Sequence, residues 1–226
     1  MDNTSSIVLT QDNSPTLYSN VHRAHYHSIF GAMQESMHIF IQHGLYDAMQ
    51  QFHSSINILE VGFGSGLNTL LTLIESKKLN VKINYTGVEK HIISEAVVQE
   101  LIQHNPFKLY LEETKLIHQN IFSTPYVIAE NFYLTKINDD IYNTLNYLNK
   151  THFNIIYYDA FAPSSQPEMW DSIIFKHLFD RLVQKGFLIT YCAKGQFKRD
   201  LKSIGFKVVS CPGPIGKREI TKAIKE

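Results

Sequence analysis

A glycine-rich turn is the first feature of this sequence with residue types and spacing suited to chemistry. Gly62, Gly64 and Gly66 alternate after an apolar run and stand before a run with helical spacing. Glycine lets the backbone turn tightly and approach a ligand, and the start of a helix offers free N–H groups to a carboxylate or phosphate. The turn therefore predicts a cofactor site, and a tight turn without a ligand is the alternative.

Two acids stand where such a cofactor would be held. Glu60 lies two residues before the first glycine, and Glu89 ends the next expected strand. A carboxylate at that strand end can accept both ribose hydroxyls of an adenosine. The dinucleotide fingerprint is G-x-G-x-x-G, whereas the glycines here are spaced G-x-G-x-G, so an NAD-dependent enzyme is the alternative for this motif.

A third acid, Asp159, follows a run of apolar and aromatic residues typical of a fully buried strand. Ligands of open α/β sheets bind beyond the carboxyl ends of strands, so we expect Asp159 to face the same crevice as the glycine turn. A carboxylate there, in a loop with Phe161 and Pro163, can orient an amino group. An aspartate that only shapes a turn is the alternative.

The elements that must position these residues alternate along the chain. Strands are expected at 56–61, 85–89, 132–137, 153–159, 186–192, 206–209 and 219–224. Helices are expected at 31–52, 67–77, 94–104, 139–148, 170–183 and 196–204. This alternation predicts an α/β fold with a mostly parallel sheet flanked by helices. Residues 1–55 are expected to pack on that core as a helical extension, whereas 107–130 and the stretch before 31 show no clear pattern.

Length and composition favour one globular domain, 1–226. A chain of 226 residues with 44% hydrophobic and 19% charged residues has material for one core and is not disordered. Two cysteines make neither a disulfide framework nor a zinc site, and His22, His25 and His27 lack further ligands at metal spacing, so no metal is expected. No signal peptide or membrane-spanning run is visible, and we expect a cytoplasmic protein without a membrane partner.

The charge is balanced overall but divided unevenly. Lys+Arg and Asp+Glu number 21 each, yet the residues from Cys192 onward carry +6 and the first 191 carry −6. Such asymmetry can mark a polyanion-binding end. The basic residues in or beside loops near the expected site, or on an exposed helix, are Lys194, Lys198, Arg199, Lys202, Lys217 and Arg218. We expect them to contact RNA phosphates, with a solvated helix face as the alternative.

The ordered set of motifs resembles the MnmC-type tRNA methyltransferases, within the class I S-adenosylmethionine (SAM) methyltransferases. The matching segments are HYHSIFGAMQESMHIF at 25–40, EVGFGSGLN at 60–68, GVEK at 87–90, DAFAPSSQPEMW at 159–170, TYCAKG at 190–195 and GPIGKRE at 213–219. The resemblance implies a Rossmann-like fold, SAM as cofactor and tRNA as partner. In two-domain members a flavin-dependent oxidase domain follows; this chain ends at Glu226, so it resembles the standalone form and no flavin is expected in it.

The resemblance also implies residue roles, with Asp159 as the catalytic residue. The implied cofactor-binding residues are Tyr26, Ser28, Glu35, Glu60, Gly62, Gly64, Gly66, Asn68, Glu89, Lys90 and either Asn138 or Asp139, the last pair at the adenine. The expected substrate-binding residues are Phe161, Pro163, Lys194, Lys198, Arg199, Lys217 and Arg218. Trp170 is expected in the core.

The implied reaction methylates the aminomethyl group of wobble 5-aminomethyl-2-thiouridine, giving 5-methylaminomethyl-2-thiouridine. An alkyl amine has a pKa of about 10.4 and is mostly protonated at neutral pH, so it must lose a proton before its nitrogen can attack. We expect Asp159 to orient the amine and to accept or relay that proton. The alternatives are a SAM-dependent methyltransferase of a small-molecule amine and a non-catalytic tRNA- or nucleotide-binding protein.

Overall fold

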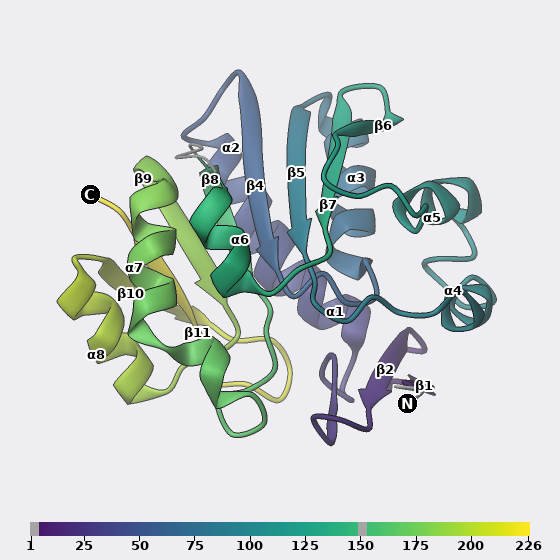
Figure 1. Cartoon of the computed structure of the whole chain (residues 1–226), viewed down its shortest axis with the longest axis horizontal. Helices are drawn as coiled ribbons and strands as arrows, with labels where there is room; N and C mark the ends of the chain where they lie inside the picture. Colours follow the sequence, from purple (N-terminus) through teal and green to yellow (C-terminus); the bar gives the residue numbers. More distant parts are fainter. Residues whose placement is uncertain (1–4, 149–152) are drawn as a thin grey trace.

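The computed structural model describes residues 5–148 and 153–226, and an eight-stranded sheet forms its centre (Figure 1). The strands are β4 (Ser55–Val61), β5 (Lys82–Val88), β6 (Tyr126–Ala129), β7 (Phe132–Ile137), β8 (Phe153–Tyr158), β9 (Leu182–Thr190), β10 (Lys207–Pro212) and β11 (Glu219–Ile224). Their order is β10-β11-β9-β8-β4-β5-β7-β6, with β7, β5, β4, β8 and β9 parallel and β6 and β11 antiparallel to their neighbours. The predicted mostly parallel α/β sheet is confirmed.

Side-chain alternation in β8 explains why its sequence is apolar throughout. Ile155 and Tyr157 pack into the core on one face of the sheet, whereas Ile156 and Tyr158 pack into the core on the other. A parallel strand covered on both faces has no solvent side, so both sets must be apolar. Because β4 pairs in parallel with both β5 and β8, the carboxyl ends of these three strands meet at one edge of the sheet.

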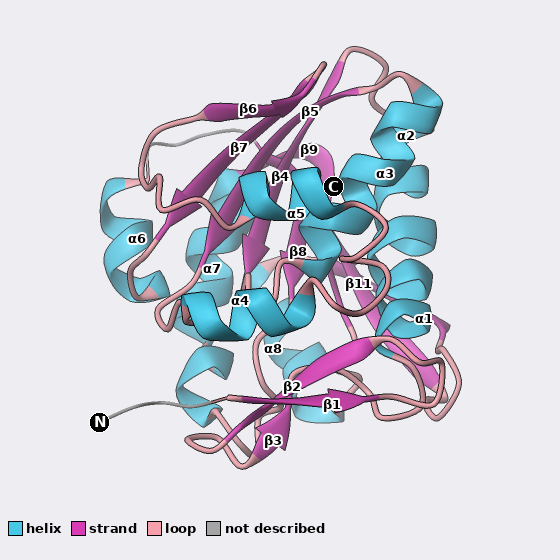
Figure 2. Ribbon diagram, turned by 90° about the vertical axis from the view of Figure 1, so that its right-hand side faces the viewer, coloured by secondary structure: helices cyan, strands magenta, loops and turns pink. Residues whose placement is uncertain are grey.

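Helices cover both faces of this sheet (Figure 2). One face carries α1 (Ala32–Ser36), the π-helix η1 (Met37–Tyr46), α2 (Asp47–Met49), α3 (Leu67–Leu79), α4 (Glu95–Leu101) and α5 (Leu111–Ile117). The other carries α6 (Ile141–Tyr147), the 3₁₀ turn η2 (Pro167–Trp170), α7 (Ser172–Arg181) and α8 (Gly195–Ile204). Ser94 caps α4 as predicted, its hydroxyl accepting a hydrogen bond from the Val97 N–H.

The N-terminal segment differs from the expected helical extension. Before α1 it forms a separate antiparallel sheet of β1 (Ser6–Leu9), β2 (Pro15–Ser19) and β3 (Ala24–His25). These strands have two to five residues, too few for a periodic pattern to stand out. The helix expected at 31–52 is present but passes through a π-helical stretch, where the Tyr157 ring occupies the space that a Cβ at Gly44 would need.

Two further segments correct the sequence interpretation. The unassigned stretch 107–130 contains α5 and β6. The helix expected at 170–183 is shorter: Asp171 caps α7 by accepting a hydrogen bond from the Ile173 N–H, and β9 begins directly at Leu182. Within the described ranges, no helix combines the length and apolar character needed to cross a membrane.

Candidate active site

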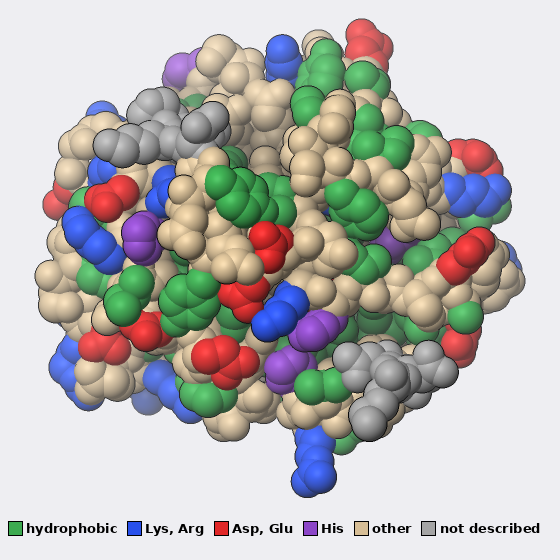
Figure 3. Space-filling view, viewed as in Figure 1, with side chains coloured by type: hydrophobic (Ala, Val, Ile, Leu, Met, Phe, Trp, Pro, Cys, Tyr) green, Lys and Arg blue, Asp and Glu red, His purple; other side chains and the backbone are tan. Residues whose placement is uncertain are grey.

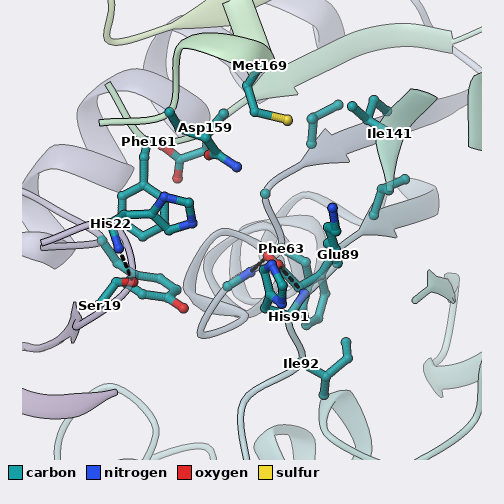
Figure 4. Close-up of a pocket in the computed structure, with 18 of the residues that line it drawn as sticks. Ser19, His22, Phe63, Glu89, His91, Ile92, Ile141, Asp159, Phe161 and Met169 are labelled. Atoms are coloured by element: carbon teal, nitrogen blue, oxygen red, sulfur yellow. Dashed lines mark hydrogen bonds between the residues drawn. The ribbon is translucent and has the colours of Figure 1, made fainter. Parts of the chain in front are cut away.

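A cavity of about 240 Å³ lies at the edge where β4, β5 and β8 end. Figure 4 shows Asp159, Phe161 and His22 grouped on one side of this cavity and Glu89 on another. Its wall combines the glycine turn after β4, the residues after β5, the start of α6, the loop after β8 and the N-terminal segment around β2 and β3. The structure therefore brings the three predicted acidic regions to one place, as sheet topology requires.

The glycine turn has the conformation that its sequence predicts. Gly62 and Gly64 have φ values of 90° and 51°, a region that side chains disfavour, and both line the cavity. A Cβ on Gly62 would lie 2.6 Å from the Asp159 carbonyl oxygen, and one on Gly64 would lie 2.9 Å from the Tyr26 ring. Gly66 faces elsewhere: a Cβ there would meet Ile117 and His118 rather than the cavity. Gly66 thus lies against the end of α5, outside the cavity wall.

Asn68 joins two carboxylates beneath the cavity. Its Nδ2 donates to Glu60 Oε1 and to Asp159 Oδ2, both at 2.9 Å. Glu60 is fully buried, also accepts hydrogen bonds from Tyr85 and Thr69, and does not line the cavity itself. Asn68 lines the cavity, and its buried Oδ1 has no hydrogen-bond partner among the described residues.

Burial sets the protonation of this acid pair. It raises the pKa of Glu60 to about 8; the hydrogen bond from Asn68 opposes the rise, and the nearby Asp159 adds to it. Burial likewise raises the pKa of Asp159 to about 7, with a further increase from Glu35 and opposing effects from Asn68 and Lys217. Near neutral pH the Glu60 carboxyl is therefore mostly protonated, and Asp159 is poised between its two forms.

Glu89 provides a carboxylate at the other end of the cavity. It follows β5, and its oxygens accept hydrogen bonds from the Gly64 N–H at 3.1 Å and the His91 N–H at 2.8 Å. Burial raises its pKa. Lys90 also lines the cavity, where its ammonium pairs with Asp140 at 3.0 Å. These contacts hold the Glu89 carboxylate against the glycine turn, where it can accept hydrogen bonds from the hydroxyl groups of a ligand.

The residues after β7 include the two expected at the adenine position, Asn138 and Asp139. Asn138 donates from Nδ2 to the carbonyl oxygens of Glu89 and Lys90, and it does not line the cavity. Asp139 lines the cavity, although its carboxylate also accepts hydrogen bonds from the Asp140 N–H, Asn143 and Tyr147. The geometry favours Asp139 and gives Asn138 the task of holding the strand ends together.

The N-terminal segment closes one side of the cavity. Tyr26 contacts the Phe161 ring edge-on, with ring centroids 5.0 Å apart, and both residues line the wall. Ser28 and Glu35 lie behind it, where the Glu35 carboxylate accepts the Ser28 N–H and forms an ion pair with Lys217. Neither residue lines the cavity, and from this position Glu35 raises the pKa of Asp159.

Two of the lysines that were predicted to bind RNA form ion pairs within the protein. Lys198 pairs with Glu219 at 2.8 Å and donates to Ser210, with 16% of its side chain exposed. Lys217 pairs with Glu35 and lies over the Tyr191 ring. Lys194, Arg199, Lys202 and Arg218 are exposed. None of the predicted basic residues, nor Pro163, lines the cavity.

Sequence reasoning missed several residues of the wall. His22 and His27 line the cavity, and burial lowers the pKa of His27 to about 4, so it is neutral there. Met169 and Ile141 line the side opposite Ile92 (Figure 4). Their positions depend on loops and on the unpredicted β2–β3 connection, which left no periodic signal. The described part of the chain contains no group of three or more His, Cys, Asp or Glu side chains placed to hold a metal ion. Trp170 packs against the core as expected.

Comparisons with known proteins show the family to which this chain belongs. The family model of the S-adenosyl-L-methionine-dependent methyltransferases matches residues 100–226, and this chain belongs to that family. It is therefore an enzyme of the methyltransferase class with SAM as its cofactor. A crystal structure of MNMC2 from Aquifex aeolicus is similar with a TM-score of 0.82 and 24% identity, over 98% of this chain and 70% of that one. The fold is a Rossmann-like class I methyltransferase fold.

Sequence relatives point to one particular group within the family. The bifunctional protein MnmC of tRNA 5-methylaminomethyl-2-thiouridine biosynthesis from Idiomarina loihiensis is 26% identical over 97% of this chain and 38% of its own length. The protein of the same name from Magnetococcus marinus is 29% identical over 85% of this chain and 30% of its own length. This chain spans about a third of the length of the curated relatives it matches.

Proposed function

We propose that this protein transfers a methyl group from SAM to the aminomethyl group of 5-aminomethyl-2-thiouridine at the wobble position of tRNA. The product is 5-methylaminomethyl-2-thiouridine, and the activity belongs to the cytoplasm. The observation that carries the proposal is the half-buried Asp159 carboxylate, which faces the same cavity as the glycine turn and Glu89. The similarity of almost the whole chain to part of the MnmC proteins supports the tRNA substrate. We also propose that residues 1–226 act as one methyltransferase domain in which 1–55 form an extension.

Residues at two ends of the cavity support the binding of SAM. Glu89 would accept hydrogen bonds from the ribose hydroxyls, since its carboxylate is already held against the Gly64 N–H. The free Asn68 Oδ1 would accept a hydrogen bond from the amino group of the methionine part, because a buried acceptor needs a donor. When bound, SAM supplies a methyl group attached to a positively charged sulfur. After the transfer this sulfur is part of a neutral thioether, which is the leaving group.

Asp159 would prepare the amine for this transfer. An aminomethyl group arrives mostly as an ammonium, which the Asp159 carboxylate attracts. An adjacent cation favours the charged form of an acid, so the substrate itself would draw Asp159 into the ionised state. Asp159 then takes one proton and holds the nitrogen with its lone pair toward the methyl group; positioning of this kind accounts for much of the acceleration in such transfers.

The exposed basic residues would hold the tRNA backbone. Lys194, Arg199, Lys202 and Arg218 are available for phosphates, whereas Lys198 and Lys217 already have partners. Figure 3 shows acidic, basic and histidine side chains gathered at the lower centre of the face where β4 and β5 end. A nucleotide would enter the cavity from this side. Phe161 lines that side and would contact the base.

Mass spectrometry of tRNA nucleosides tests the proposal. Purified protein and SAM are incubated with tRNA that carries 5-aminomethyl-2-thiouridine, and the digest is analysed for a mass gain of one methyl group on that nucleoside. A matched reaction contains free nucleosides and small amines. Methylation of tRNA is the expected result. Methylation of the small amines alone would support the small-molecule alternative, and SAM binding without any methylation would support a non-catalytic protein.

A further inference from the structure

His22 lies on the face of Phe161 next to Asp159 (Figure 4). The two rings are stacked, with centroids 4.5 Å apart and an angle of 29° between their planes. Tyr26 meets the same phenylalanine edge-on at 82°. One face of Phe161 is therefore covered by an imidazole, in the position and orientation in which a nucleotide base would stack on an aromatic ring.

This stack connects two parts of the cavity wall that are distant in sequence. His22 belongs to the turn between β2 and β3, and its N–H donates to Ser19 Oγ at 3.1 Å. Its Nδ1 lies 3.4 Å from the Ser165 carbonyl oxygen, near the upper limit for a hydrogen bond. The neighbouring Val21 is 55% exposed. The His22 side chain thus meets the loop after β8 through the stack on Phe161 and a long hydrogen bond to Ser165.

The proposed reaction brings two molecules, a cofactor and a nucleotide base, into a cavity of about 240 Å³ beside Asp159. The base must reach the Asp159 side of this cavity, and the His22 turn is the part of the wall that contacts Phe161 there.

We propose that His22 occupies the place of the target base on Phe161 until tRNA binds. The uracil ring then displaces the imidazole, the turn at 20–23 moves away, and the base stacks on Phe161 with its aminomethyl group toward Asp159. This inference rests on the proposed function for the identity of the base. Because the imidazole competes with the uracil ring for Phe161, removal of the imidazole must strengthen tRNA binding.

Kinetics with tRNA test the competition through the direction of the change. His22→Ala should lower KM for aminomethyl-bearing tRNA by about two- to tenfold with kcat little changed, a range that follows from the strength of one aromatic pair. In a Phe161→Ala background the same substitution should have no effect, because no stack remains to break. His53→Ala, an exposed histidine just before the amino end of β4, is the matched control. A raised or unchanged KM for His22→Ala would overturn the proposal.

Limited proteolysis tests the turn without any RNA. Arg23 is exposed in this turn with a φ of 50°, so trypsin cleavage after it reports how often the turn opens. Phe161→Ala leaves the sequence around Arg23 intact and should increase that cleavage about two- to tenfold, as should His22→Ala. Unchanged cleavage in both variants would contradict a turn held by this stack. If the wild type methylates no tRNA, the proposed function fails, while the cleavage result still decides whether His22 holds the turn.

Discussion

At the scale of residues, Asn68 connects two buried acids. Its amide nitrogen donates to both Glu60 and Asp159, and the nearby Asp159 carboxylate disfavours the charged form of Glu60. Near neutral pH the pair therefore carries less than two negative charges. A bound cation would draw protons off, so the site gains charge when its ligands arrive.

Glu60→Gln should flatten the pH dependence of stability in the protein without cofactor. The folded-state pKa of Glu60, about 8, lies above its ordinary value of 4.5, so its contribution is fully present below pH 4.5 and is lost as pH rises to 8. For one proton this loss is at most about 1.4 kcal/mol per pH unit. Urea unfolding between pH 5 and 8 should show a smaller decline in the variant than in the wild type. An unaltered decline would mean that Glu60 is charged in the folded protein, and Glu130→Gln, at an exposed acid, is the control.

The sequence predicted the importance of Glu60 but not its depth. Ile58 and Glu60 are two residues apart on β4, so their side chains share the face that lies under α3, where Thr69 and Tyr85 meet the carboxylate. Spacing from the glycines indicates an acid near the cofactor. Only the tertiary structure shows that Asn68 lies between Glu60 and the cavity.

At the scale of elements, predictability followed the strength of the local pattern. The buried strand β8 and the glycine turn into α3 were predicted because burial on both faces and positive φ values demand particular residues. The β1–β3 sheet was missed because its short strands depend on pairing with one another, as between Ser6 and Tyr18, rather than on periodicity. As a result the sequence did not reveal which residues close the cavity.

The basic helix α8 shows the same limit for charge. Phe197 and Leu201 fix its buried face, which leaves Arg199 and Lys202 exposed, but the pairing of Lys198 with Glu219 of β11 depends on tertiary structure. A count of charges therefore overstates how many lysines are available to RNA.

Replacing Lys194, Arg199 and Lys202 together by Ala should weaken tRNA binding and flatten its salt dependence. Each lost phosphate contact lowers the slope of log affinity against log salt by about 0.9 or less. Filter binding at several salt concentrations measures this, and SAM affinity should barely change. A triple Ala variant of Lys77, Lys78 and Lys82, near the opposite end of the sheet, removes equal charge as the control. Equal losses in both triple variants would indicate a general charge effect rather than a binding surface.

At the scale of the whole molecule, two distant segments meet behind Asp159. Glu35 of α1 pairs with Lys217 of the β10–β11 connection, and the two have opposite effects on the pKa of Asp159. The N-terminal extension is therefore part of the electrostatics of the site. This coupling was not visible in sequence, where both residues were expected to touch ligands directly.

Substitutions in this pair should move the acid limb of the pH–rate profile in opposite directions. Lys217→Met removes a cation that lowers the pKa of Asp159, so the limb should shift to higher pH, whereas Glu35→Gln removes an anion that raises it, so the limb should shift to lower pH. Each shift should be on the order of half a pH unit. Measurements of kcat/KM from pH 5 to 9 give the result, with Lys207→Met in an exposed ion pair as the control. Shifts of the same sign would rule out this electrostatic account.

The central claim is that Asp159 prepares an amine on tRNA for methylation, and Asp159→Asn tests it most directly. Asparagine keeps the size and one oxygen acceptor for Asn68 but removes the carboxylate. Single-turnover methylation of aminomethyl-bearing tRNA at saturating SAM, from pH 6 to 9, should be slower by roughly 10²–10⁴-fold and partly rescued at high pH, where more of the amine is neutral. A variant whose rate stays within about threefold of the wild-type rate at every pH would contradict the account. Such a loss is well under the roughly 1.4 kcal/mol that corresponds to a tenfold change in rate.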